Sequence, residues 1–403
     1  MAECAGDMRD STFPTRSGSR RTTAHDRPNA VPKICFLAIA GTLLSLAGSH
    51  ANAFEVLVGV NVTGADRLNE QQQDALVEEL RHNGVKVVRS GIGPKFAHFT
   101  IRAWQNGIRA LAEVPPTAGG SATHMRAADQ SLGLEWVEPG ITDADPARYK
   151  VWHEAQVATL ESSGVQLAAF ELGNEINTAG FNGDFDPALA SGRELGLADL
   201  NNPEDPEGRA IAASYRAYLR MLAVLKDVRD HSRLNTRTPI ISAGLADSGP
   251  PGRRPGQKVD GVSAPATLQF LQLNGLDELV DGYGAHFYPS NQDPSRPVSE
   301  RIEGLGERAL ALCTRAKPCW LTEWGFPNPQ LSCPIHDETR ERLIRTEREA
   351  FQEFVNDGKL VATIYYNWQS LPGFEVPSIF RCGELTVAGK LALQPIVQRS
   401  TRR

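Results

Sequence analysis

The sequence lacks the short motifs that identify several large classes of enzyme. It has no phosphate-binding loop and no dinucleotide fingerprint, and its nine histidines show neither an HExxH pattern nor paired Cys/His spacing. The net charge is only −6 over 403 residues, which is too small to indicate electrostatic capture of nucleic acid or of an anionic membrane. We therefore expect no cofactor, no metal ion and no nucleic-acid partner.

Long apolar runs are also scarce. Residues 34–47 (ICFLAIAGTLLSLA) form a short run that is preceded by Lys33 and followed by Ala51-Asn52-Ala53. The run is too short for a comfortable transmembrane helix, and its flanks are typical of a signal peptide cleaved after Ala53. A buried core helix is the alternative, but the polar residues before it offer nothing to pack against. We expect a polar extension and signal peptide over 1–53, and a secreted or periplasmic monomer with no membrane span.

Cysteine is rare, and two of the six cysteines precede the expected cleavage point. The mature chain keeps Cys313, Cys319, Cys333 and Cys382. An even number of cysteines in an exported chain indicates two disulfides, for which three pairings are possible.

From residue 54 to the C-terminus, strand-like runs alternate with amphipathic stretches. We predict strands over 56–62, 85–92, 108–116, 167–175, 239–246, 281–288, 319–326 and 362–368. We predict helices over 69–82, 95–105, 146–162, 207–230, 264–274, 298–315, 337–357 and 384–398. Eight strands that are each followed by a helix indicate the α/β class and a single-domain (β/α)8 TIM barrel over 54–403. A doubly wound open sheet would bring a phosphate-binding glycine turn after the first strand, and GVNVTGADR is not one.

The predicted barrel determines which segments share a face. Strand ends and the loops that follow them lie on the C-terminal face, where active sites of such barrels are found. The loops after strands three, four and five (117–145, 178–206 and 247–263) are long and rich in Gly, Pro and Asp. Because long loops in compact domains are usually functional, we expect them to wall a cleft.

The same geometry chooses among the disulfide pairings. Cys313 ends the sixth helix and Cys319 begins the seventh strand, so both lie at the bottom, whereas Cys333 and Cys382 follow strands at the top. Cross-pairing would span a strand height of roughly 15–20 Å, but a disulfide needs Cα atoms within about 7 Å. We predict the pairs Cys313–Cys319 and Cys333–Cys382.

Two glutamates end strands of this barrel. Glu175 closes the fourth strand in FELGNEIN, and Glu323 closes the seventh in WLTEWGFP. They are 323 − 175 = 148 residues apart, yet the barrel directs both into one cleft. Two carboxylates across a sugar ring are what glycoside hydrolysis requires, one to donate a proton and one to attack or support the anomeric carbon.

These motifs resemble glycoside hydrolase clan A, the barrel enzymes with catalytic glutamates at the ends of strands four and seven. Asn174-Glu175 resembles the clan's Asn-Glu pair, and Glu323 in TEWG resembles its nucleophile. TEWG is nearest to families 5 and 39, while ELGNE is also similar to the heparanase-type family. The resemblance implies retention by double displacement on a β-linked glycan or exopolysaccharide, with Glu175 as acid/base and Glu323 as nucleophile. It also implies that Asn174 donates to the sugar 2-hydroxyl.

Three further residues at strand ends fit the same site. Arg89 ends the second strand, where its guanidinium would orient the carboxylate of Glu323. His286 and Tyr288 end the sixth strand and, two residues apart, project to the same side. We expect Tyr288 to bond Glu323 and His286 to contact sugar hydroxyls. The alternatives are a role for Arg89 within a barrel layer and a structural role for His286.

Aromatic residues complete the expected site. Trp368 ends the eighth strand, where the clan often has an aromatic that stacks on the sugar ring, and a flat ring with a polar edge suits a sugar. Trp136 and Trp324 would add stacking in the cleft. Burial in the core is the alternative for Trp368.

Two other functions remain open. One is a non-catalytic carbohydrate-binding barrel that acts in exopolysaccharide assembly or export, since a fold alone does not prove activity. The other is a barrel enzyme of unrelated chemistry, such as an aldolase. That function would require a catalytic lysine or a phosphate site after strands seven and eight, and the sequence shows neither clearly.

Overall fold

A computed structural model describes residues 55–132, 134, 137–247, 261–289, 296–369 and 375–399. All of them belong to one compact unit, Asn52–Arg403. The predicted signal peptide lies outside the described residues. Within those residues, no helix combines the length and the apolar character that crossing a membrane requires.

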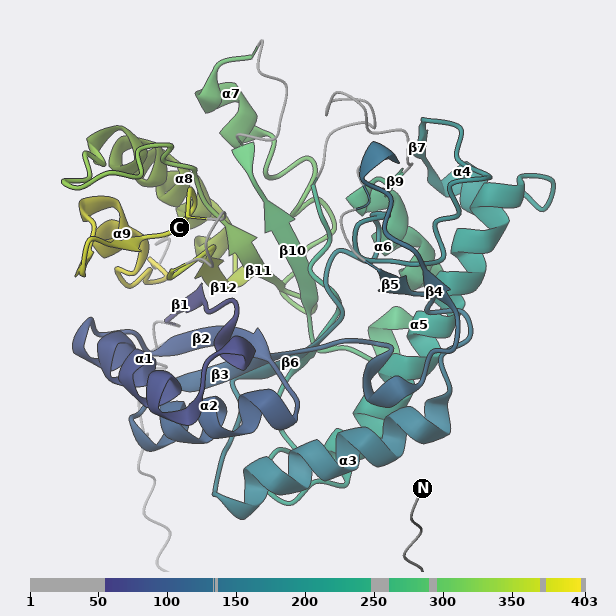
Figure 1. Cartoon of the computed structure of the whole chain (residues 1–403). Helices are drawn as coiled ribbons and strands as arrows, with labels where there is room; N and C mark the ends of the chain where they lie inside the picture. The colour runs from purple at the N-terminus through teal and green to yellow at the C-terminus, as the bar shows by residue number, and fades with distance from the viewer. Residues whose placement is uncertain are drawn as a thin grey trace, which may run out of the picture. The chain divides into compact units, whose positions relative to one another are not determined.

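Eight strands form one all-parallel sheet in the order β10-β11-β12-β1-β2-β3-β6-β8 (Figure 1). Their bounds are β1 Leu57–Asn61, β2 Val87–Gly91, β3 Arg109–Val114, β6 Ala169–Leu172, β8 Ile240–Ile241, β10 Tyr283–Phe287, β11 Cys319–Trp324 and β12 Leu360–Tyr365. Parallel bridges from Ile241 to Gly282 and from Leu245 to Ala285 join β8 to β10 and close the sheet. The prediction of a (β/α)8 barrel is confirmed.

Alternation along the strands divides the core into two parts. Inside the barrel, a compact cluster is formed by Val87, Leu111, Ala168, Ala169, Ile241, Trp320, Ala362 and Ile364. A much larger cluster fills the space between the strands and the surrounding helices. Side chains two positions apart on a strand point to the same side. Polar residues two positions beyond these inward apolar residues therefore also point into the barrel, and they meet above the inner cluster.

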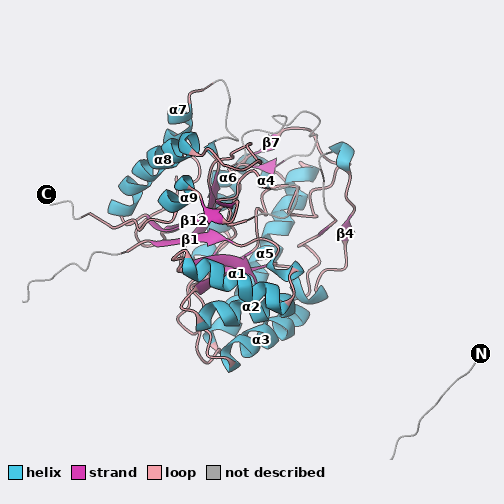
Figure 2. Ribbon diagram, turned by 60° about the vertical axis from the view of Figure 1, so that its left-hand side comes forward, coloured by secondary structure: helices cyan, strands magenta, loops and turns pink. Residues whose placement is uncertain are grey.

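Helices surround the sheet (Figure 2). Their bounds are α1 Glu70–His82, α2 Pro94–Gln105, α3 Pro146–Ser162, α4 Leu197–Leu200, α5 Pro206–Asp230, α6 Ala264–Leu273, α7 Val298–Glu303, α8 Glu338–Asn356 and α9 Val387–Ala392. Four of them, α2, α3, α5 and α6, begin with proline in the first turn, and several are capped by an Asn, Asp, Ser or Thr side chain. Six of the eight predicted helices match within two residues at each end.

The other two predicted helices are wrong in extent. The helix expected over 298–315 ends at Glu303, where Gly304 caps it and Gly306 follows against the ring of Phe354. Two glycines so close together weaken a helix. The stretch 384–398 begins instead as β14 (Glu384–Leu385), which pairs with β13 (Phe380–Arg381), and only then continues as α9.

The loops at the carboxyl ends of the barrel strands contain short pairs of strands. β4 (Met125–Arg126) pairs with β5 (Glu138–Pro139) in the loop after β3. β7 (Glu194–Leu195) pairs with β9 (Gly261–Val262), which joins the long loops after β6 and β8. The long loops therefore carry structure of their own.

Both predicted disulfides are confirmed. Cys313 bonds Cys319 with a Cα–Cα distance of 5.5 Å, and Cys333 bonds Cys382 with a distance of 6.1 Å. The second ties the loop after β11 to the β13–β14 turn. Two disulfides fit a protein of an oxidising compartment.

Candidate functional site

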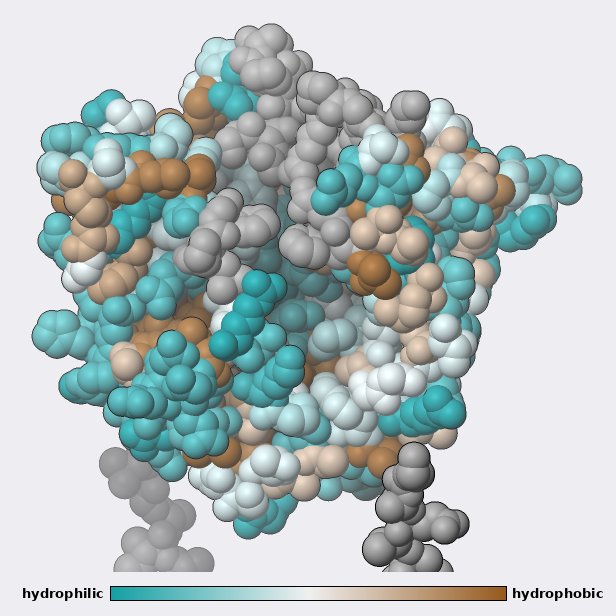
Figure 3. Space-filling view, viewed as in Figure 1, coloured by the Kyte–Doolittle hydropathy of each residue, from teal (hydrophilic) through white to brown (hydrophobic). Residues whose placement is uncertain are grey.

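Polar side chains from the strands meet at the carboxyl end of the barrel. They are Asn61, Arg89, Glu113, Glu171, Asn174, Glu175, His286, Tyr288, Thr322, Glu323 and Tyr366. In the space-filling view the middle of the molecule is hollowed, and hydrophilic residues form the visible walls of the hollow (Figure 3). The fold thus brings residues that lie on, or directly after, seven of the eight strands to one place.

The two predicted glutamates lie face to face. A carboxylate oxygen of Glu175, one of Glu323 and a ring nitrogen of His286 all lie within 4.8 Å of one another. Nδ1 of His286 is 2.8 Å from Oε1 of Glu175 and 3.6 Å from Oε2 of Glu323. The sequence prediction that these carboxylates share one site agrees with this geometry.

Glu323 is held by hydrogen bonds to both of its oxygens. Nη1 of Arg89 donates to Oε1 at 2.7 Å, and the hydroxyl of Tyr288 donates to Oε2 at 2.6 Å. The expected contact between Tyr288 and Glu323 is therefore present. Because one donor is a permanent cation and the other a hydroxyl, the carboxylate is fixed in one orientation.

Arg89 is the centre of a buried polar network. Its Nε donates to Oε2 of Glu171 at 2.5 Å, and Nη2 donates to Oδ1 of Asn174 at 2.8 Å. Its Nη1 also donates to Oδ1 of Asn61 at 3.0 Å. Burial alone would lower the pKa of Arg89, but the surrounding carboxylates, chiefly Glu171 and Glu323, raise it above its ordinary value. The guanidinium stays charged.

Glu171 is the second anion of this network. It is completely buried, and its Oε1 accepts from the hydroxyl of Thr322 at 2.7 Å and from the backbone N–H of Gly244 at 3.0 Å. With Arg89 on its other oxygen, every side of the carboxylate is satisfied. Glu171 is an interior ion-pair partner, as its position in the middle of the strand indicates.

Glu175 has an unusual backbone. Its φ is +41°, a region that non-glycine residues seldom occupy and that is often found at functional sites. Its N–H donates to the carbonyl of Gly244 at 2.9 Å, and its own carbonyl accepts from the N–H of Thr178 at 2.9 Å. The preceding Asn174 accepts from Arg89, while its amide nitrogen makes no hydrogen bond to any described residue. This donor remains available for a ligand.

The sequence predicts contacts between His286 and sugar hydroxyls, but the structure does not leave its ring open to the cleft. It is fully buried, and its Nδ1 bonds Glu175 instead. Burial lowers its pKa, but Glu323 and Glu175 more than offset this effect, so the pKa lies above the ordinary value for histidine. Its ring packs so closely on Gly244 that an added Cβ would lie 2.1 Å from Nε2. His286 therefore positions the glutamates.

The structure contradicts the predicted roles of two tryptophans. Trp324 is completely buried on the outer side of β11, where its ring contacts Phe351 and Tyr365 edge-on. Trp368 is also completely buried, stacks on Phe380 and donates from Nε1 to Glu79 of α1 at 2.6 Å. Neither side chain can reach a substrate. Trp136 lies outside the described residues.

Tyr366 occupies the position expected for Trp368. Its partly exposed ring meets that of Tyr288 edge-on, with centroids 6.3 Å apart. Burial, followed by the charge of Glu323, raises the pKa of Tyr366 to about 12. The alternation along β12, in which Ala362 and Ile364 point inward, identifies Tyr366 as the next inward residue. The strand ends at Tyr365, so the alternation does not extend to Trp368.

Replacing each of these aromatics with alanine is expected to give opposite results. Tyr366→Ala removes a partly exposed ring beside Glu323, so we expect a loss of turnover or a raised KM with little change in Tm. Trp368→Ala removes a buried ring and is expected to cost about 3–5 kcal/mol of unfolding free energy. Denaturant unfolding and steady-state kinetics on both variants check this. A destabilised Tyr366→Ala with unchanged kinetics would contradict the assignment.

A metal ion is the alternative occupant of this site. Within the described ranges, Glu175, His286 and Glu323 are the one group whose potential ligand atoms are close enough to share an ion. Both oxygens of Glu323 already accept hydrogen bonds, from Arg89 and from Tyr288. A dication here would also lie beside the guanidinium of Arg89 and would repel it. The donor set favours acid–base chemistry over metal binding.

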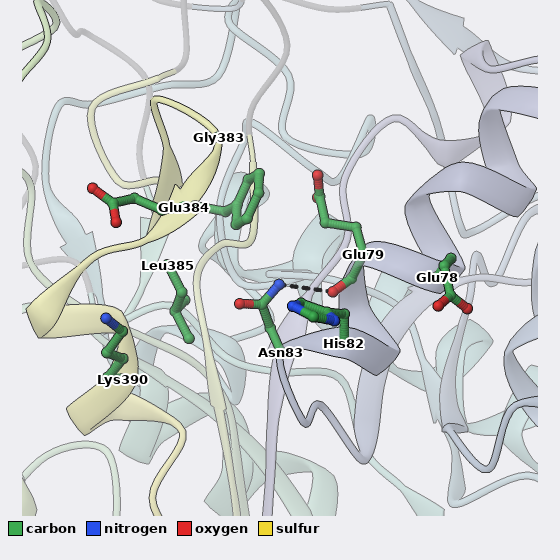
Figure 4. Close-up of a pocket in the computed structure, with 9 residues that line it drawn as sticks. Glu78, Glu79, His82, Asn83, Gly383, Glu384, Leu385 and Lys390 are labelled. Atoms are coloured by element: carbon green, nitrogen blue, oxygen red, sulfur yellow. Dashed lines mark hydrogen bonds between the residues drawn. The ribbon is translucent and has the colours of Figure 1, made fainter.

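A separate pocket of about 490 Å³ lies outside the barrel (Figure 4). It is bounded by the C-terminal half of α1, by the β13–β14 turn and by α9. Figure 4 shows Glu79, His82 and Asn83 on one side, with Glu384 and Lys390 on the other. None of the paired glutamates of the barrel lines it, so it is not the site of the chemistry described above.

Comparisons with known proteins gave only structural similarities. No family model and no curated protein sequence matches the chain. A fungal β-1,4-galactanase structure covers 83% of this chain and 93% of its own at 16% identity, with a TM-score of 0.46. An exo-β-1,4-mannosidase from Opitutaceae bacterium strain TAV5 covers 85% and 59% at 14% identity, with a TM-score of 0.49. A β-glucosidase from Thermotoga maritima covers 83% and 96% at 12% identity, with a TM-score of 0.48.

These scores are low. We therefore base the fold on the strand pairing of this chain and the function on the geometry of its site.

Proposed function

We propose that this protein is a retaining glycoside hydrolase that cleaves β-linked glycans by double displacement. The observation that carries the proposal is the facing pair Glu175 and Glu323, with carboxylate oxygens within 4.8 Å. Retaining glycosidases place their two carboxyl groups about 5–5.5 Å apart, whereas inverting enzymes leave about 6.5–9.5 Å for a water molecule. The short separation supports direct attack by one carboxylate.

The hydrogen bonds of the two glutamates support different roles. Glu323 is only 8% exposed and is fixed by Arg89 and Tyr288, which suits a nucleophile that must present one oxygen to the anomeric carbon. Glu175 is more exposed, and His286 is the one side chain among the described residues that bonds its carboxylate. That freer carboxyl suits the group that protonates the leaving oxygen and later accepts a proton from water.

Other residues would position the substrate. The amide nitrogen of Asn174, whose Oδ1 is held by Arg89, would donate to a ring hydroxyl next to the reacting carbon. Tyr366 would provide an aromatic edge or face for the sugar ring. Arg89 holds both Asn174 and Glu323, so one guanidinium aligns the nucleophile and the hydroxyl-binding group together.

The proposal is tested by incubating the purified protein with β-glucans, mannans, xylans and bacterial exopolysaccharides. We expect release of reducing ends from at least one of them, and a first product that NMR shows to have the anomeric configuration of the substrate. A first product of inverted configuration would exclude Glu323 as nucleophile. Tight binding of a glycan without any release would instead support a non-catalytic carbohydrate-binding barrel.

A further inference from the structure

The β4–β5 hairpin after β3 has two different faces. Arg126 and Glu138 are cross-strand neighbours, and Arg126 is only 7% exposed while Glu138 is half-buried. Their sequence neighbours Met125 and Val137 are 51% and 56% exposed. Since successive residues of a strand point to opposite faces, Arg126 and Glu138 form the inner face of the hairpin.

The inner face of the hairpin is directed toward Glu113. Glu113 lies on β3 in register with Gly91 and Glu171, two positions beyond the inward Leu111, so its side chain enters the mouth of the barrel. The charges of Glu113 and Glu138 interact strongly enough to affect the ionisation of Glu138. The charge of Glu323 also affects the ionisation of Glu113, so Glu113 lies within electrostatic range of the proposed nucleophile.

These three side chains have unused hydrogen-bonding groups. Neither the Glu113 nor the Glu138 carboxyl has a hydrogen-bond or ion-pair partner within the part of the chain that the structure describes. Arg126 donates from Nη1 to the carbonyl of Asn182 at 3.0 Å, but its buried Nε and Nη2 have no partner among the described residues. Polar groups that are buried in native proteins are normally satisfied, so the two buried nitrogens of Arg126 lack a partner that a ligand could supply. The partly exposed carboxyls of Glu113 and Glu138 are open to the same kind of ligand.

We propose that Glu113, Glu138 and Arg126 form a sugar-binding subsite beside the catalytic glutamates that accepts neutral or cationic sugar units and rejects uronic acids. This inference rests on the proposed glycoside hydrolase function and extends it to the class of sugar. Sugar hydroxyls both donate and accept, so they can satisfy the two carboxyls and the free nitrogens of Arg126 at once.

The charge around the subsite determines the selectivity. Five carboxyl groups (Glu113, Glu138, Glu171, Glu175 and Glu323) surround the mouth of the barrel. The permanent cations among the described residues there are Arg89 and Arg126. Arg89 is already bonded to Glu171 and Glu323, and the charge of Arg126 is offset by its cross-strand neighbour Glu138, so neither cation offers much attraction to an incoming anion. A carboxylate on the sugar would enter a region of excess negative charge and low dielectric. Two further arginines of the sequence, Arg253 and Arg254 in the long loop after β8, lie outside the described residues.

The selectivity should depend on pH. Burial, offset in part by Arg89 and His286 and reinforced by Glu171 and Glu323, raises the pKa of Glu113 to about 7. Burial also raises the pKa of Glu138 to about 7. The charge of Arg126 lowers this pKa in part, and the charge of Glu113 raises it further. Below this range both groups are neutral and repel an anionic sugar weakly. Above it both are charged, so discrimination against uronates should increase as the pH rises through 7.

The experiment compares one glycan backbone in two charge states. The neutral hexose glycan cleaved in the panel, or a β-1,4-glucan oligosaccharide if none is cleaved, is oxidised at C6 to its uronate form. Binding of both forms to the Glu323→Gln variant is measured by calorimetry at pH 5.5 and pH 8.5 in low salt. We expect the uronate to bind at least about tenfold more weakly at pH 8.5, equivalent to about 1.4 kcal/mol, and less than about threefold more weakly at pH 5.5.

Charge-neutral variants connect the selectivity to these residues. Adding Glu113→Gln and Glu138→Gln should reduce the difference at pH 8.5 to about threefold or less, because amides keep the hydrogen bonds but remove the charge. Glu349→Gln, on the exposed face of α8, is the matched control and should change nothing. Equal binding of the two forms at pH 8.5, or tighter binding of the uronate, would overturn the subsite. Failure of the wild type to cleave any glycan would instead overturn only the proposed reaction, because binding is measured without turnover.

Discussion

Glu323→Gln is expected to reduce kcat/KM for the neutral glycan by about 10⁴-fold or more while the protein stays folded. Glutamine retains the shape of the side chain: its carbonyl oxygen can still accept from Arg89, and its amide nitrogen can donate to the rotated hydroxyl of Tyr288, so the site should keep its form. It has no negative charge with which to attack the anomeric carbon. The loss should therefore appear in the chemical step, with kcat lowered far more than KM is raised.

Kinetics with an activated aryl glycoside separate the two glutamates. In Glu323→Gln no covalent intermediate can form, so a good leaving group should not restore turnover. In Glu175→Ala, a leaving group that needs no protonation should still depart, and azide should then accelerate turnover by replacing the activated water. Loss of natural substrate turnover in Glu175→Ala should be about 10²–10⁴-fold. The opposite result would reverse the two roles. In that case azide would accelerate Glu323→Gln and give a product of retained configuration, and it would not accelerate Glu175→Ala.

The wild-type and Glu349→Gln proteins are the references for these measurements, with Tm recorded for each variant. If Glu323→Gln retained more than about a tenth of the wild-type activity at an unchanged Tm, Glu323 would not be the nucleophile. A large drop in Tm would show a structural effect. The activity of the folded fraction would then have to be compared.

The barrel and the two glutamates were predictable because both depend on local patterns. Alternation of strand-like and helical stretches predicts the fold, and a residue that closes a parallel strand must lie on one face of a barrel. The disulfides followed from the same geometry, because two cysteines lie at each end of the barrel and only the pairs within one end are close enough. In these cases the position along the chain determines the position in space.

The aromatic residues were harder to assign, because whether such a side chain points into the barrel or out toward the helices depends on where the regular strand ends. Strict alternation from the inward Trp320 would direct Trp324 inward as well. The strand pairing shifts between Leu321 and Trp324, so the adjacent Thr322 and Glu323 both point inward and Trp324 points outward. Trp368 lies three residues beyond the last residue of β12, where alternation no longer applies. Its partner Glu79 lies on α1, and no local pattern predicts that contact.

The subsite residues were missed for a different reason. Glu138 belongs to a hairpin within a long loop, and its approach to Glu113 depends on how that loop folds over the barrel. Asp184, which accepts from the backbone N–H groups of Ile141 and Thr142, ties this loop to the one after β6. Such contacts between loops have no sequence period, so only the three-dimensional structure identifies the cluster.

Arg89→Met is expected to cost about 3–5 kcal/mol of unfolding free energy, the largest stability effect at the site. Arg89 is 6% exposed and Glu171 is completely buried, so the substitution leaves a buried carboxylate without its cation. Thr322 and the N–H of Gly244 still donate to Glu171, but neither carries a charge. Urea unfolding of the variant, compared with the wild type at pH 7, measures this cost.

A second substitution distinguishes stability from alignment. Arg89→Met combined with Glu171→Gln removes the stranded charge, so we expect much of the lost stability to return. Activity should not return, because Glu323 and Asn174 both still lack the guanidinium that orients them. Arg89→Lys keeps a positive charge but not the planar fork that reaches four acceptors, so it should be more stable than Arg89→Met yet remain slow. Full activity in the double variant would show that Arg89 serves only to neutralise Glu171, and that the orientation of Glu323 depends on Tyr288 and His286 alone.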